Sequence, residues 1–119
     1  MSLYVDTFKR GIVEMLALRY LCETDAHGYQ ISKAIRQRTH GLVTMKEGAF
    51  YPLLYRLEQS GYTTSRTESL KSGTPNDRIR IIYHITPSGR KYLEDMKSDY
   101  DLVHSTVVSF FNWEGPHDE

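Results

Sequence analysis

Six basic and aromatic residues between positions 46 and 80 have the chemistry needed to contact nucleic acid. Arginine forms paired hydrogen bonds to guanine or phosphate, and lysine attracts phosphate as a point charge. We predict DNA contacts from a helix (Lys46, Tyr51 and Arg56) and from the β-hairpin that follows it (Lys71, Arg78 and Arg80). The competing interpretation is a solvated surface charge for each basic residue, and packing against the preceding helix for Tyr51.

Asp101 and His104 lie three residues apart on a predicted helix, so their side chains share one face. Carboxylate and imidazole are zinc ligands, and two such pairs across a dimer could bind a metal ion. The set lacks a cysteine and a firm third ligand. A metal-responsive protein is therefore the alternative, and a simple surface pair is the preferred interpretation.

Motifs for catalysis are absent from the sequence. It has no glycine-rich phosphate loop, no metalloprotease helix and no Ser/His/Asp or Cys/His set in a supporting context. We therefore expect no enzymatic activity, no cofactor and no bound metal.

The charges are unevenly distributed along a chain that is neutral overall. Residues 94–119 hold seven acidic side chains and one lysine, a net charge of −6, so residues 1–93 carry +6. A basic segment attracts phosphates even when the whole chain is neutral. The distribution favours a basic binding head and an acidic C-terminal element.

Length and composition indicate one small globular domain. The chain has 119 residues, of which 39% are hydrophobic and 25% charged. No apolar run approaches the roughly 20 residues of a membrane helix, and the N-terminus lacks the hydrophobic segment of a signal peptide. The single cysteine, Cys22, agrees with a reducing compartment. We expect a cytoplasmic protein with no membrane partner.

Hydrophobic spacing predicts the elements that position these residues. A first helix, capped by Asp6 or Thr7, runs to about Glu23. After a turn at residues 25–28 a second helix spans Tyr29 to Arg38, with Tyr29 facing inward. A third begins at Lys46 or Glu47 and ends before Gly61, with an apolar stripe of Phe50, Leu53, Leu54 and Leu57. Two β-rich runs, 62–69 and 79–85, then form a hairpin.

The last predicted element is a long helix that begins at Thr86 and Pro87, a good N-cap followed by a residue tolerated in the first turn. Alternating spacings of three and four residues define a heptad seam, which is typical of a helix that pairs with another helix. Ordinary core packing within one chain is the alternative. The predicted dimer interface comprises Leu93, Met96, Tyr100, Val103, Val107, Phe110 and Phe111.

Together these elements predict a mainly helical α+β fold: a winged helix-turn-helix head with a two-stranded wing, plus a long C-terminal dimerisation helix. We assign residues 1–85 to the DNA-binding head, 86–113 to the dimerisation helix and 114–119 to a disordered tail. A symmetric dimer of such heads would read a palindromic operator on double-stranded DNA.

Four motifs in register resemble the PadR family of winged-helix transcriptional regulators. They are residues 8–11 (FKRG), 27–31 (HGYQI), 48–61 (GAFYPLLYRLEQSG) and 83–89 (YHITPSG). The single C-terminal helix resembles the smaller subgroup of the family, which dimerises through one helix per chain. The chain departs from the family pattern at Ala49-Phe50, at Tyr62-Thr63 and at Arg78 and Arg80, which Ile79 separates.

The resemblance implies a dimeric repressor of an adjacent operon, released when a small aromatic or drug-like effector enters near the dimer helices. An effector pocket would then be lined by Phe8, Met96, Tyr100, Val103 and His104. The sequence identifies neither the operator nor the effector, and it leaves open whether the protein represses or activates transcription.

Overall fold

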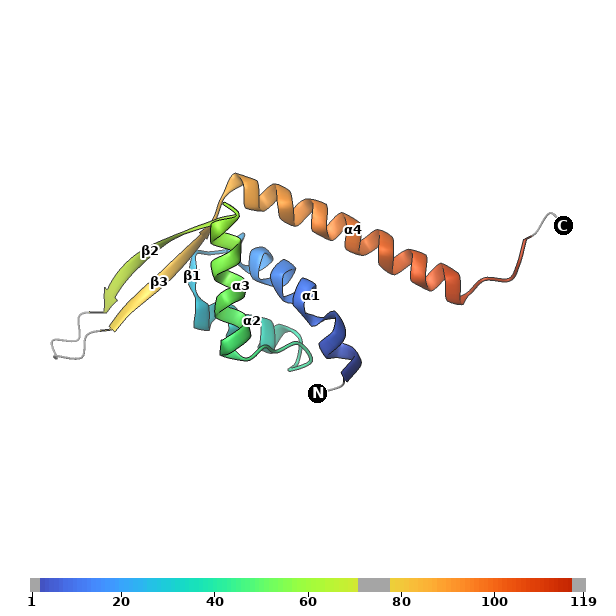
Figure 1. The fold of residues 1–119 in the computed structure, drawn as a ribbon, viewed down its shortest axis with the longest axis horizontal. Helices are drawn as coiled ribbons and strands as arrows, with labels where there is room; N and C mark the ends of the chain where they lie inside the picture. Colours follow the sequence, from blue (N-terminus) through green and yellow to red (C-terminus); the bar gives the residue numbers. More distant parts are fainter. Residues whose placement is uncertain (1–2, 71–77, 117–119) are drawn as a thin grey trace.

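A computed structural model describes residues 3–70 and 78–116, and the side chains of residues 8–69 and 79–116. In chain order the elements are α1 (Leu3–Leu21), β1 (Ala26–His27), α2 (Gly28–Arg38), α3 (Glu47–Gln59), β2 (Thr63–Leu70), β3 (Arg78–Ile85) and α4 (Pro87–Phe111). A head of three helices and a small sheet carries the wing on one side (Figure 1). The far half of α4 extends away on the other side, so the molecule measures 77 × 33 × 21 Å. The predicted α+β winged-helix fold is confirmed.

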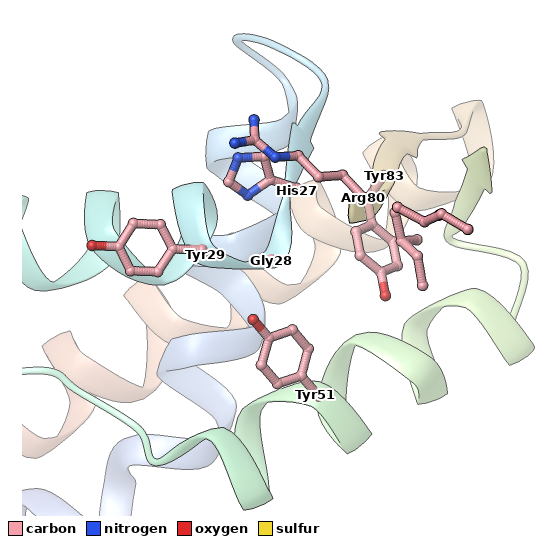
Figure 2. A pocket seen from close by; sticks show the side chains of 8 residues that line it. His27, Gly28, Tyr29, Tyr51, Arg80 and Tyr83 are labelled. Atoms are coloured by element: carbon pink, nitrogen blue, oxygen red, sulfur yellow. The ribbon is translucent and has the colours of Figure 1, made fainter. Parts of the chain in front are cut away.

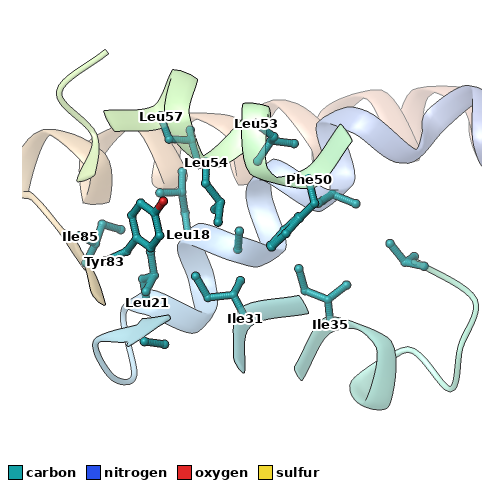
Figure 3. Close-up of a cluster of buried hydrophobic side chains, with 14 residues drawn as sticks. Leu18, Leu21, Ile31, Ile35, Phe50, Leu53, Leu54, Leu57, Tyr83 and Ile85 are labelled. Atoms are coloured by element: carbon teal, nitrogen blue, oxygen red, sulfur yellow. The ribbon is translucent and has the colours of Figure 1, made fainter. Parts of the chain in front are cut away.

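The apolar stripe of α3 forms the centre of the head, as its spacing predicts. Phe50, Leu53, Leu54 and Leu57 are each at most 3% exposed and pack against α1 and α2 (Figure 3). These three helices and the base of the sheet enclose one continuous core. Its remaining buried members are Val13, Ala17, Leu18, Leu21, Ala26, Ile31, Ile35, Val43, Tyr83 and Ile85.

The sheet has three strands, in the order β1-β3-β2, with antiparallel pairing throughout. β2 and β3 form the predicted wing, in register from Thr63 opposite Ile85 to Leu70 opposite Arg78. The predicted turn at residues 25–28 is wrong, because Ala26 and His27 form β1 and pair with Tyr83 and Ile82. A strand of two residues is too short to show an alternating pattern, so the sequence had no signal for it.

A compact junction joins the end of α3, the base of the wing and the start of α4. Thr86 caps α4 as predicted, because its Oγ1 accepts a hydrogen bond from the Gly89 N–H at 2.9 Å. The same hydroxyl donates to the Gly61 carbonyl at 2.7 Å, and the Thr86 N–H donates to the Tyr62 carbonyl at 3.1 Å. We refer to Gly61, Tyr62, Thr86 and Gly89 as the junction.

Two further contacts connect the junction to α1. The ring of Tyr62 stacks on the ring of Tyr92 in α4, with centroids 4.0 Å apart and planes 5° from parallel. The Tyr92 hydroxyl donates to Glu14 Oε1 of α1 at 2.5 Å. This hydrogen bond, together with burial, raises the pKa of Tyr92 to about 12. The first turns of α4 are thereby held against both α1 and the end of α3.

Two details of the predicted helices are wrong. Helix α1 begins at Leu3, so Asp6 and Thr7 lie inside it and do not cap it. Residues 1–10 contain no glycine or proline, so nothing in the sequence prevents the helix from beginning before Asp6. Tyr29 is 57% exposed and does not face the core. It lies two residues from the buried Ile31, and residues two apart point to different sides of a helix.

The tight packing at the junction predicts that Gly89→Ala destabilises the fold. A Cβ at this position would lie 2.1 Å from the Tyr62 carbonyl oxygen and 2.9 Å from Ile85 Cγ1. Relief requires backbone movement, so we expect a loss of roughly 2–3 kcal/mol in the free energy of unfolding. Urea denaturation followed by circular dichroism measures it.

Gly11→Ala is the matched control, because a Cβ added there would have no heavy atom within 4 Å other than those of its chain neighbours and the backbone of its own helix. We expect Gly11→Ala to raise stability by about 0.5–1 kcal/mol through helix propensity. Equal urea midpoints for Gly89→Ala and the unaltered chain would refute the packing argument.

Candidate nucleic-acid interface

The face of α3 opposite the core is open to solvent and carries the predicted recognition residues. Lys46, the N-cap residue, is exposed, and so are Tyr51 and Arg56. Tyr55, at 63% exposure, lies on the same side. The buried stripe fixes which side of α3 faces outward, since residues off a 3–4 spacing point away from the core. This face presents one cation at each end and two phenol rings between them.

A cleft of about 410 Å³ lies between the N-terminus of α2, helix α3 and strand β3 (Figure 2). It brings together Tyr51 and Arg80, two residues that the sequence assigned separately to the helix and the wing. The sequence reading missed His27 and Tyr29 as members of this site. The lining comprises His27, Gly28, Tyr29, Tyr51, Ile79, Arg80, Ile81 and Tyr83.

Gly28 makes the cleft possible by leaving room for Tyr51. A Cβ at position 28 would lie 2.5 Å from Tyr51 Cε1, so a side chain there would push the ring away. Tyr51 therefore packs against the start of α2, which was the competing interpretation, yet it stays 42% exposed. Both descriptions of Tyr51 hold at once: its ring is supported by α2 while part of it faces the cleft.

His27 caps α2 with its side chain. Its Nδ1 accepts a hydrogen bond from the Gln30 N–H at 3.3 Å, and its own N–H donates to Gln30 Oε1 at 3.0 Å. This is a capping box in which histidine replaces the usual serine or threonine. Burial lowers the pKa of His27, and the positive charge of Arg80 lowers it further. A neutral ring with a free Nδ1 lone pair is what the cap requires.

The base of the wing is anchored by an acidic residue in the loop before β1. Asp25 accepts from Arg66 Nη1 on β2 at 2.9 Å, and its other oxygen lies 2.8 Å from His84 Nδ1 on β3. Hydrogen bonds from His84 and Arg66 hold the pKa of Asp25 below its usual range. Arg66 is therefore committed to a carboxylate, although it lies on the basic hairpin.

Of the three wing residues predicted to contact DNA, the structure describes only the side chain of Arg80. Arg80 lies directly opposite Glu68 in the hairpin register and faces the cleft. Arg78 is the first residue of β3, and its side chain falls outside the described part of the chain. Lys71 also lies outside the described residues, as do residues 117–119 of the predicted tail.

A second, apolar pocket of about 470 Å³ lies between α1 and α4, and we call it the α1–α4 pocket. It brings together four of the five predicted effector residues: Phe8, Met96, Tyr100 and Val103. His104 is not part of its lining but stacks on Tyr100, with ring centroids 6.2 Å apart. The other lining residues, which the sequence did not indicate, are Gly11, Ile12, Met15 and Asp99.

The predicted seam of α4 divides into two parts. Leu93 and Met96 are partly buried against the core of their own head. Beyond them, α4 leaves the head and its apolar residues face solvent. Their exposures are Tyr100 44%, Val103 61%, Val107 48%, Phe110 79% and Phe111 82%.

The residues weighed for metal binding do not form a site in the described part of the chain. Asp101 forms an ion pair with Lys97 at 2.8 Å. Within residues 3–70 and 78–116, no group of three or more histidine, cysteine or acidic side chains could hold a metal ion. Nor does any helix in the described ranges have the length and hydropathy needed to span a membrane.

Comparison with known proteins identifies the family. Residues 17–95 match the transcriptional regulator PadR-like family. The chain belongs to this family. A solved transcriptional regulator from Clostridium thermocellum has a TM-score of 0.77 and 34% identity to this PadR-like chain, covering 87% of it and 97% of the other.

Two other similar proteins are longer than this chain. The Escherichia coli K12 transcriptional regulator YqjI is 27% identical over 100 residues, which are 84% of this chain and 44% of YqjI. The chain thus spans less than half the length of that relative. Bacillus subtilis PadR, solved in complex with operator DNA, shares the fold at 24% identity with a TM-score of 0.61, covering 71% of this chain and 44% of the other.

The histidine cap predicts that the stability of α2 depends on pH. Because the folded pKa of His27 is below its ordinary value near 6.5, the cap contributes fully above that value. It is lost as pH falls through the lowered folded pKa, since a protonated Nδ1 cannot accept the Gln30 N–H. We expect a loss of about 1 kcal/mol from this group, a typical N-cap contribution.

His27→Asn should keep a cap that does not titrate in this range and so flatten the dependence of the urea midpoint on pH between 7.5 and 5. His40→Asn is the control, because His40 is exposed with φ of 53°, which asparagine tolerates. It should leave the pH dependence intact. The same slope in all three proteins would exclude His27 as its source.

Proposed function

We propose that this PadR-like protein is a dimeric, sequence-specific DNA-binding repressor of an adjacent operon. The observation that carries the proposal is that the cleft brings Tyr51, on the open face of α3, together with Arg80 of the wing (Figure 2). The structure of a family relative in complex with operator DNA supports DNA as the partner. Residues 1–85 would form the binding head and residues 86–113 the dimerisation helix.

In this proposal α3 enters the major groove and the wing lies along the backbone. Arg56, exposed near the end of α3, is suited to a bidentate contact with guanine. Lys46 and the wing residues Lys71, Arg78 and Arg80 would position the head through phosphates. The cleft between them is where a sugar-phosphate strand would pass, within reach of Tyr51 and Tyr29.

The exposed seam of α4 supports a homodimer. Large apolar residues on a helix that overhangs its own head remain costly to leave in water, and a second copy of the same seam would bury them. Two heads related by a two-fold axis would read two half-sites of a palindromic operator about one helical turn apart.

The α1–α4 pocket supports release by a small aromatic or drug-like effector. Its volume is within the range of small-molecule sites, and its walls come from the head and from the proposed dimerisation helix. A ligand that binds more tightly to one spacing of α1 and α4 would shift the population of dimers competent for DNA. The Tyr92–Glu14 hydrogen bond lies one helical turn from the pocket residue Met96, and through it and the junction the change would reach α3.

DNA binding is tested with DNA from upstream of the protein's own gene, by fluorescence anisotropy over a range of salt concentrations. Arg56→Ala should weaken specific binding by roughly 1–3 kcal/mol through loss of a base contact. Arg80→Ala should weaken binding to all sequences and lower the slope of log affinity against log salt by about one.

Lys97→Ala removes the same charge from α4, away from the proposed interface, and should leave both quantities nearly unchanged. Salt-independent binding, or equal effects of all three substitutions, would exclude the proposed interface.

Dimerisation is tested by sedimentation equilibrium of Val107→Lys. This substitution places a charge in the exposed seam, so we expect the dimer to dissociate at least about tenfold more readily. Ser105→Lys adds the same charge on the opposite side of α4 and should leave the dimer intact. A monomeric unaltered chain, or a dimer unaffected by Val107→Lys, would contradict pairing through this seam.

A further inference from the structure

The lining of the α1–α4 pocket contains one charged residue. Seven of its eight members are aromatic, aliphatic, thioether or glycine, and they come from both helices. The eighth is Asp99 on α4, and the lining includes no lysine, arginine or histidine. An apolar cavity with a single charged group usually owes its binding specificity to that group.

Asp99 differs from the neighbouring aspartates of α4 because it has no lysine or arginine partner in the described part of the chain. Asp95 pairs with Lys91 and Asp101 pairs with Lys97, each at 2.8 Å and each four residues along the helix. Four residues before Asp99 stands Asp95, and four residues after it stands Val103, so neither helical neighbour can neutralise it. Across the described part of the chain, Asp99 forms no ion pair and no side-chain hydrogen bond.

The acidic residues of α4 around the pocket also disfavour an anionic ligand and favour a cationic one. The turns of α4 that border the pocket, residues 94–103, hold four acidic side chains and one lysine, and two of those acids pair with Lys91 and Lys97. An anionic ligand would meet repulsion from Asp99 and from this segment, with no basic lining residue to offset it. A cationic ligand would be attracted by both.

We infer that the α1–α4 pocket selects positively charged aromatic molecules, with Asp99 as the residue that determines this specificity. The inference rests on the proposed function, in which this pocket receives an effector. Phe8 and Tyr100 offer ring faces to the aromatic part and to the cation itself. Met15 and Met96 supply adaptable, polarizable walls. The cationic group would lie at Asp99, where the carboxylate receives its charge-assisted hydrogen bond.

The test uses three probes of nearly equal size with the whole 119-residue chain: 2-naphthylmethylammonium, 2-naphthylmethanol and 2-naphthylacetate. Isothermal titration calorimetry in the absence of DNA measures their affinities. We expect the cation to bind most tightly and the anion most weakly. Asp99→Asn should reduce the affinity for the cation by roughly three- to fivefold, as for an exposed ion pair, and leave the neutral alcohol unchanged.

Asp95→Asn is the matched control, because it removes the same charge from the same helix, outside the pocket. It should leave the preference for the cation intact. Equal losses in both variants would show that the general acidity of α4, and not Asp99, sets the preference, and would overturn the inference. Equal binding of cation and anion by the unaltered chain would also overturn it.

Absence of binding by all three probes would overturn it too, and would indicate that a second copy of the chain fills this pocket. DNA binding by the same preparations separates this inference from the proposed function. A protein that binds its upstream DNA without preferring the cation fails only the ligand inference, whereas a protein that prefers the cation without binding DNA fails only the proposed function.

Discussion

The close approach of Gly89 to the Tyr62 carbonyl controls how the parts of the molecule are arranged. At this point α4 crosses Tyr62, the residue directly before β2, with no space for a side chain between the two backbones. Thr86 completes the contact by bonding to Gly61, Tyr62 and Gly89 within one hydrogen-bonded unit. The direction in which α4 leaves the head is thereby tied to the end of α3, and the base of the wing belongs to the same unit.

This constraint gives the α1–α4 pocket its place in the proposed mechanism. The pocket lies just beyond the Tyr92–Glu14 hydrogen bond, where α4 separates from α1. On one side of it the helix is fixed to the head, and on the other side it carries the exposed seam. A ligand in the pocket would therefore act where small changes in the angle between α1 and α4 are amplified along the overhanging helix. The spacing of two heads in the proposed dimer would change most.

Elements with a strong local signal could be predicted from the sequence, and contacts between distant residues could not. The stripe of α3 and the Thr86 cap follow from spacing and residue type alone. The anchoring of Asp25 by His84 joins residues 59 positions apart, and no local pattern encodes it. His27 was recognised within a motif, but its role as a cap was missed because histidine is an uncommon cap residue. The grouping of Asp99 with Phe8 likewise depends on how α1 crosses α4.

Ion pairs within the head leave fewer of its basic side chains available to DNA than its net charge suggests. A count along the sequence gives residues 1–93 a charge of +6, but part of the basic side is already held by carboxylates. Arg38 forms two hydrogen bonds to Glu23, at 2.7 and 2.9 Å, and Arg66 is held by Asp25. These arginines stabilise the arrangement of α1, α2 and the wing and are less available to phosphate. In the proposed complex, the phosphate contacts then depend on a few residues, chiefly Lys46 and the wing residues Lys71, Arg78 and Arg80. Recognition would depend more on the fit of α3 and the cleft to the duplex than on a broad field of charge.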